Sequence, residues 1–188
     1  MTRYRGNVEA VRNLIRETEV HRDVYIDDEV FHLEMEHLFS NTWVYVGHDS
    51  QVPNPGDYFG TTVGTQPILM VRHTDNTVKV LHNRCPHKGT RVANDPCGNT
   101  GRFFRCPYHA WIYANDGRIV SLPFHQDAYG GEDGFPTQGQ GLIPAPAIGI
   151  YNGLIFVNLN PKPVPLDEFL GDFRFYLDLY TRQSPSGI

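Results

Sequence analysis

The sequence predicts a mainly β fold: an antiparallel sandwich or barrel-like domain, preceded by two helices and followed by one. Three observations support this expectation. Short apolar or alternating runs separated by turn signals extend from position 42 to position 160. The chain holds 18 Gly and 14 Pro among its 188 residues, which suits frequent turns. Helical spacing of apolar residues is confined to the two ends of the chain.

Three segments have this helical spacing. Residues 7–19 repeat Val, Leu and Ile on one face, which predicts a first amphipathic helix. The second, residues 28–39, has Asp27 and Asp28 at its start, where negative charge favours a helix N-terminus. Residues 165–180 repeat Leu, Phe and Tyr at spacings of three and four and predict the C-terminal helix. We interpret the first two helices as packing elements.

The strands are predicted between these helices. They fall within residues 42–48, 57–64, 66–73, 78–83, 101–107, 110–120 and 141–160. The Asn-Asp-Gly at 115–117 predicts a hairpin, and Asn152-Gly153 predicts a turn between two final strands. Residues 130–146, rich in Gly, Gln and Pro, are expected to form a long loop.

Composition excludes several classes of protein. The net charge of −5 and the lack of a Lys/Arg run argue against a nucleic-acid partner. The N-terminus has no signal-peptide core, and no apolar run reaches membrane-spanning length, so we expect a soluble, cytoplasmic protein without a membrane partner. Three cysteines cannot build a disulfide framework, and two of them lie close to histidines, which points to metal.

The metal pattern consists of two short motifs. Cys85-Pro86-His87 and Cys106-Pro107-Tyr108-His109 each offer one thiolate and one imidazole. A Rieske-type [2Fe–2S] cluster takes two Cys on one iron and two His on the other, which matches Cys85, His87, Cys106 and His109. A single zinc ion is the alternative. Zinc modules, however, usually pair Cys with Cys and His with His at short spacing, whereas each motif here mixes the two.

These motifs, extended to Lys88-Gly89 and Ala110-Trp111, resemble the Rieske motif of aromatic-ring-hydroxylating dioxygenase α subunits. The resemblance covers residues 24–180. This sequence departs from the family by having Ala110 where Gly is usual and by an additional Cys97 in the spacer, interpreted as a free thiol in a loop.

The resemblance implies a domain plan and a function. Residues 1–40 would be an N-terminal helical segment, residues 41–160 the Rieske domain, and residues 161–188 the start of a catalytic domain that this chain lacks. That domain would hold a mononuclear Fe(II), so the chain would be the electron-transfer part of a longer oxidoreductase. It would pass electrons from a ferredoxin or reductase to an iron that hydroxylates an aromatic ring with O2, in an α3 or α3β3 assembly. Both cluster histidines would lie at the exposed tip of the loops, and His109 would make the electron-exit contact. Trp111 would lie beneath the ligand loops.

The residues around the ligands indicate which kind of Rieske centre this is. Respiratory-chain Rieske proteins resemble this chain but carry a clamping disulfide and a Ser that bonds to a cluster sulfur. Tyr108 and Trp111 occupy the corresponding positions in this sequence. Fewer hydrogen bonds to sulfur stabilise the reduced state less, so we predict a potential of about −150 mV rather than about +300 mV. A midpoint above zero would contradict this prediction.

Two alternatives remain at this stage. One is a stand-alone Rieske ferredoxin, an electron carrier without catalysis, and the other is a zinc-stabilised binding module. Arg84, Lys88 and Arg91 beside the first motif either guide an acidic donor or are solvated loop charges. The run Glu29-x2-His32-x4-His37 imitates the family's iron motif, but we interpret it as the surface of the second helix, because residues five apart point in different directions.

Overall fold

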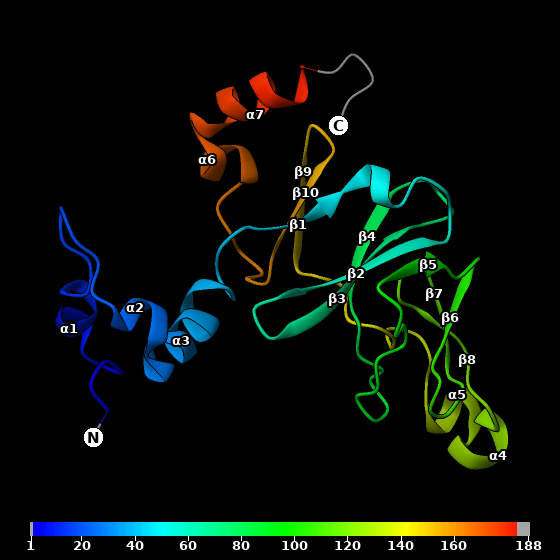
Figure 1. The fold of residues 1–188 in the computed structure, drawn as a ribbon. Helices are drawn as coiled ribbons and strands as arrows, with labels where there is room; N and C mark the ends of the chain where they lie inside the picture. Colours follow the sequence, from blue (N-terminus) through cyan, green and yellow to red (C-terminus); the bar gives the residue numbers. More distant parts are fainter. Residues whose placement is uncertain (1, 184–188) are drawn as a thin grey trace.

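The computed structural model describes residues 2–183 and contains three antiparallel sheets (Figure 1). The first has the order β1 (Val44–His48), β10 (Leu154–Asn158), β9 (Ala147–Tyr151). The second has the order β4 (Val78–His82), β3 (Gln66–Arg72), β2 (Asp57–Val63), β5 (Cys97–Asn99). The third has the order β6 (Phe103–Arg105), β7 (Ile112–Ala114), β8 (Ile119–Ser121). The expected mainly antiparallel β fold, with helices at both ends, is confirmed.

The four-stranded sheet is the middle layer, as its central strand β3 shows. Leu69 packs in the cluster that contains Tyr113 of the third sheet. Met70, on the opposite face, packs with Ile155 of the first sheet. Successive side chains of a strand point to opposite faces, so β3 is buried on both sides. Each such apolar side chain contributes about 1.5–3 kcal/mol when it is fully buried.

The N-terminal segment is helical, but its first helix is shorter than expected. The elements are α1 (Val8–Arg12), α2 (Asp23–Ile26), α3 (Asp28–Leu33) and the π-helical turn η1 (Glu34–Leu38). The predicted helix over 7–19 is wrong beyond Arg12. There the chain turns back, and Ile15 forms a β-bridge with Val20. This reversal lets Leu14 join Tyr4 in a small separate core. The second helix is confirmed over 28–38, with α3 continuing into η1.

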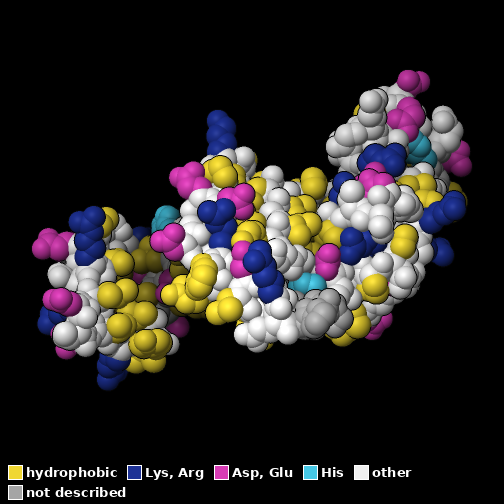
Figure 2. Space-filling view, turned by 90° about the horizontal axis from the view of Figure 1, so that it is seen from above, with side chains coloured by type: hydrophobic (Ala, Val, Ile, Leu, Met, Phe, Trp, Pro, Cys, Tyr) yellow, Lys and Arg dark blue, Asp and Glu magenta, His cyan; other side chains and the backbone are white. Residues whose placement is uncertain are grey.

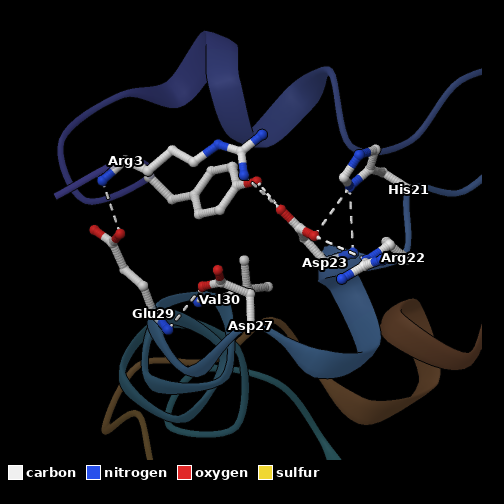
Figure 3. A network of polar contacts seen from close by, with 8 residues as sticks. Arg3, His21, Arg22, Asp23, Asp27, Glu29 and Val30 are labelled. Carbon is white, nitrogen blue, oxygen red and sulfur yellow. Dashed lines mark hydrogen bonds and ion pairs between the residues drawn. The ribbon is translucent and has the colours of Figure 1, made fainter.

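A polar network fastens the start of the chain to α2 and α3 (Figure 3). The Tyr4 hydroxyl donates to Asp23 over 2.6 Å, and Arg3 forms an ion pair with the same carboxylate at 2.8 Å. The Tyr4 hydrogen bond is the main reason that the pKa of Asp23 is lowered. Glu29 accepts the backbone N–H groups of Arg3 and Arg5, at 2.8 and 2.7 Å.

The predicted C-terminal helix is two helices, α6 (Leu166–Leu170) and α7 (Phe173–Thr181). They are separated at Gly171, whose φ of 48° and ψ of −130° lie outside the helical region. Trp43 packs against α6 beside β10. Figure 1 shows α6 and α7 at the end of the molecule that carries β9 and β10.

Two further expectations need correction. The predicted loop over 130–146 contains the short helix α5 (Gly131–Gly134), which directly follows α4 (His125–Tyr129). Cys97 lies on the edge strand β5, opposite Phe59 of β2, and not in a loop. No helix within residues 2–183 is long and apolar enough to span a membrane. Figure 2 shows hydrophobic side chains gathered on the surface of the N-terminal helical segment.

Candidate metal centre

The four predicted ligands lie on two loops that close in the same way. The first loop leads from β4 to β5, and the second leads from β6 to β7. The N–H of Cys85 donates to the Thr90 carbonyl and the N–H of Cys106 to the Trp111 carbonyl, both at 2.8 Å. In each loop the fourth residue after the Cys also donates its N–H back to the Cys carbonyl, at 2.8 and 3.0 Å. The two motifs are therefore two copies of one backbone turn.

That fourth residue must adopt a left-handed conformation. Gly89 has a φ of 75° in the first loop, and Ala110 has a φ of 58° in the second. The left-handed conformation costs a residue with a Cβ roughly 1–2 kcal/mol, whereas Gly has no such steric penalty. The departure from the family pattern at Ala110 therefore places backbone strain directly after His109.

We expect Ala110→Gly to stabilise the protein by about 1 kcal/mol, because the relief of strain exceeds the extra entropy of Gly in the unfolded chain. The matched control is Gly89→Ala, where an added Cβ would meet no atom within 4 Å, so that only the backbone term acts. It should lower stability by a similar amount. Urea unfolding followed by circular dichroism, at equal iron content, measures both changes. A midpoint for Ala110→Gly at or below that of the parent chain would contradict the assignment of strain.

The two thiols lie in the core beneath the loops. Cys85 and Cys106 are each only 2% exposed. Burial raises the pKa of the Cys106 thiol above its usual value, while the backbone N–H groups of Tyr108 and His109 act in the opposite direction. Because a thiolate is the metal-binding form, binding a metal here must release a proton and should strengthen as pH rises.

Tyr113, which the sequence reasoning missed, contacts one of these thiols. Its hydroxyl oxygen lies 2.9 Å from Cys85 Sγ. Burial is the main cause that raises the pKa of Tyr113 far above its usual value, so the hydroxyl keeps its proton. When Cys85 is a thiolate, only Tyr113 has a proton to share, and it therefore donates a hydrogen bond to the sulfur.

The two imidazoles lie close to each other but differ in their surroundings. The ring centroids of His87 and His109 are 4.6 Å apart. His109 is exposed as expected, whereas His87 is half-buried, so the expectation that both lie at an exposed tip is only half correct. Burial is the main cause that lowers the pKa of His87, which favours the neutral, metal-binding form. Its Nδ1 is buried and has no hydrogen-bond partner, as expected for an atom that ligates a metal.

Trp111 fixes one side of His87. The indole stacks on the imidazole with centroids 4.7 Å apart and planes 7° apart. Tyr129 and Phe135, from the α4–α5 region, both meet Trp111 edge-on, with ring centroids 6.0 and 5.7 Å from that of the indole. Trp111 is 4% exposed, so it lies beneath the loops, as the sequence predicted.

Asn83 is a second residue that the sequence did not reveal. Its buried amide donates to the Ala93 carbonyl at 2.7 Å and accepts the N–H groups of Val92 and Ala93 at 2.9 and 3.2 Å. These bonds tie both ends of the first ligand loop together. No local sequence pattern marks Asn83 for this role, because its hydrogen-bond partners are nine and ten residues away.

The donor set fits a two-iron cluster. Within residues 2–183, no three His, Cys, Asp or Glu side chains converge as a single ion would require. A Rieske cluster asks for only two side chains on each iron, and two thiols and two imidazoles from paired loops supply them. The run from Glu29 to His37, which imitates the family's iron motif, is not part of this site. Glu29 accepts hydrogen bonds from backbone N–H groups, and His32 Nδ1 is 2.6 Å from the Asp28 carbonyl oxygen.

Comparisons with known proteins agree with this geometry. The family model of the Rieske [2Fe-2S] domain matches residues 42–138. The chain is 38% identical over 165 residues to the N,N-dimethyl phenylurea N-demethylase subunit alpha of Sphingobium sp. (strain YBL2), covering 88% of this chain and 35% of that protein. It is 35% identical over 185 residues to the biphenyl dioxygenase subunit alpha of Paraburkholderia xenovorans (strain LB400), covering 95% of this chain and 40% of that one.

A solved structure gives the same picture. The fold matches naphthalene 1,2-dioxygenase from Rhodococcus sp. bound to indole with a TM-score of 0.83 and 33% identity, over 96% of this chain and 40% of that chain. The chain thus spans about two fifths or less of the length of these relatives.

Proposed function

Because this chain belongs to the Rieske [2Fe-2S] domain family, we propose that Cys85 and Cys106 hold one iron of its cluster and His87 and His109 hold the other. The single observation that carries this assignment is the pair of equivalent loops, each presenting one buried thiol and one imidazole. The unpartnered Nδ1 of His87 adds support.

The bound cluster supplies one-electron chemistry. The protein supplies position and environment. The buried thiols exclude water from the cysteine side, and the Tyr113 hydroxyl offers a hydrogen bond to Cys85 Sγ. The stacked indole of Trp111 holds the His87 ring in one orientation. His109, exposed and next to the exposed Tyr108, is the ligand free to contact an electron acceptor.

For the full-length protein we propose a ring-hydroxylating dioxygenase α subunit. A ferredoxin or reductase would give electrons to this domain, and an acceptor iron in a downstream catalytic domain would use them with O2 to hydroxylate an aromatic ring. The support is the similarity to biphenyl and naphthalene dioxygenases. An α3 or α3β3 assembly is part of the same proposal. Because the match with the biphenyl protein covers 95% of this chain, the flanking helical segments are shared as well, which argues against a stand-alone ferredoxin.

Oxidative N-demethylation is a second candidate for the overall reaction. The observation that favours it is the 38% identity to a phenylurea N-demethylase subunit. Both candidates share the same electron-transfer role for this chain and differ only in the chemistry of the downstream domain.

The experiment that tests the cluster uses anaerobically purified protein. Iron and sulfide analysis should give two irons per chain, and the dithionite-reduced sample should give a rhombic low-temperature EPR signal from the cluster, with His ligands on one iron. The oxidised protein should be red-brown. A colourless protein with one zinc would overturn the proposal, because zinc is d10 and has no visible absorption.

A further inference from the structure

The two ligand turns share one backbone pattern but carry their imidazoles at different positions. In both turns the fourth residue after the Cys donates its N–H back to the Cys carbonyl, so the residues between can be matched one by one. His87 follows its Cys by two positions, whereas His109 follows its Cys by three. The position equivalent to His87 is therefore occupied by Tyr108, and the position equivalent to His109 by the exposed Lys88. The second imidazole thus comes from an outward-facing position of the turn.

The two imidazoles are therefore supported differently. His87 is half-buried, and the buried indole of Trp111 stacks on it with the ring planes 7° apart. His109 is exposed, so the core offers it no comparable wall. An exposed side chain changes rotamer freely unless a neighbour restrains it. The orientation of the His109 ring thus depends on what lies beside it on the surface.

The neighbour of His109 is the ring of Tyr108. The two ring centroids are 3.8 Å apart and the planes differ by 30°. This is closer than the 4.6 Å between His87 and His109 or the 4.7 Å between His87 and Trp111. Rings this close attract each other by dispersion and by their charge distributions. Tyr108 itself is 63% exposed, so this contact lies at the surface and not in the core.

The backbone of the second turn brings these two rings together. The N–H groups of Tyr108 and His109 both act on the Cys106 thiol, so they face the inside of the turn. Both side chains stand on its solvent side, in agreement with their exposure. Ala110 closes the turn with its left-handed φ of 58° and donates its N–H to the Cys106 carbonyl at 3.0 Å. A fixed backbone therefore presents both rings on one side.

We propose that Tyr108 is the positioning residue of His109: its ring fixes the plane of this imidazole and shields one face of it from water. This inference rests on the proposed cluster and gives a role to a residue that holds no metal. Reduction adds one negative charge to the cluster, and water stabilises that charge better than an aromatic ring does. Tyr108 therefore keeps the midpoint potential lower than it would be with a solvated His109.

The test compares variants of the cluster-loaded chain. Tyr108→Ala removes the ring, Tyr108→Leu keeps apolar bulk without a planar face, and Tyr108→Phe keeps the ring and loses only the hydroxyl. The matched control is Tyr176→Ala, because Tyr176 on α7 is also 63% exposed but lies outside the ligand loops.

Three measurements are made on each sample. Pulsed EPR of the dithionite-reduced cluster gives the couplings of the two coordinated imidazole nitrogens, which depend on the orientation of each ring. A redox titration gives the midpoint potential. Iron analysis and far-UV circular dichroism show whether the cluster and the fold are retained.

Tyr108→Ala should change or broaden one of the two nitrogen couplings and leave the other, from the stacked His87, as in the parent chain. Its midpoint potential should shift upward, because water replaces the ring. Tyr108→Leu should alter the same coupling with a smaller rise in potential. Tyr108→Phe and Tyr176→Ala should match the parent chain. Loss of iron from folded Tyr108→Ala and Tyr108→Leu, with iron retained in Tyr108→Phe, would also support the assignment.

Two results would overturn it. One is an iron-loaded Tyr108→Ala with both couplings and the potential unchanged. The other is an equal change in Tyr108→Phe or Tyr176→Ala, which would trace the effect to the hydroxyl or to surface aromatic rings in general. A parent chain without dithionite-reducible iron would instead overturn the proposed function.

Discussion

Cys106→Ala is expected to remove both irons from the protein, whereas Cys97→Ala is expected to retain them. The first change leaves one iron with Cys85 as its only protein ligand, and a cluster held by three side chains loses its closed coordination. The second removes an exposed thiol on the edge strand β5, which the ligand loops do not use. The two variants delete the same chemical group, so their difference isolates its position.

Iron and sulfide analysis together with the visible spectrum measure this outcome. Because Cys106 is buried, its alanine variant could also lose packing, so far-UV circular dichroism is recorded alongside. Two irons in Cys106→Ala, or none in a folded Cys97→Ala, would show that the ligand set has been assigned wrongly.

Tyr113→Phe is expected to lower the midpoint potential of the cluster while keeping its iron. The hydroxyl lies 2.9 Å from Cys85 Sγ, and a hydrogen bond to that sulfur stabilises the reduced, more negative state more than the oxidised one. A difference of about 1 kcal/mol between the two states corresponds to roughly 40 mV for a one-electron couple. We therefore expect a fall of about 30–60 mV.

A redox titration monitored by EPR gives the potential of both forms. Tyr58→Phe is the matched control, because Tyr58 is a buried tyrosine of the same core cluster whose hydroxyl makes no hydrogen bond to a cysteine among the described residues. Its potential should match that of the parent chain. An unchanged or higher potential for Tyr113→Phe would mean that the hydroxyl does not donate to the sulfur. An equal fall in both variants would trace the effect to the loss of polarity and not to this bond.

The fold was predictable where local pattern and tertiary packing agree. The continuous apolar run in β3 indicated a buried strand, and the run is buried on both faces. The prediction and the structure differ where a contact between residues distant in sequence determines the end of an element. The turn after Arg12 ends α1 because Leu14 packs with Tyr4 and Val30, which no local period reveals. Gly171 was visible in the sequence, but the periodic Leu and Phe residues on either side outweighed it.

The ligand candidates were predictable because the chemistry of the cluster requires Cys and His in a short motif. Their partners were not. Tyr113 reaches Cys85 across 28 residues of sequence, and Asn83 reaches Ala93 across ten. Both contacts exist only when the sheets are assembled. Ala110 is an intermediate case. The sequence shows that Ala stands where the family usually has Gly, but the strain that this causes can be recognised only from the left-handed φ of the residue.

The pairing of β1 with β10 has a consequence for how this domain can be joined to others. Val44 lies opposite Val157, so the polypeptide enters and leaves the β core on adjacent strands. In topological terms the β core is an insertion. Both flanking segments leave it at the same place, so together they can form a second domain without crossing the core. The cluster-bearing part can therefore be exchanged between parent proteins as a cassette with its two junctions side by side.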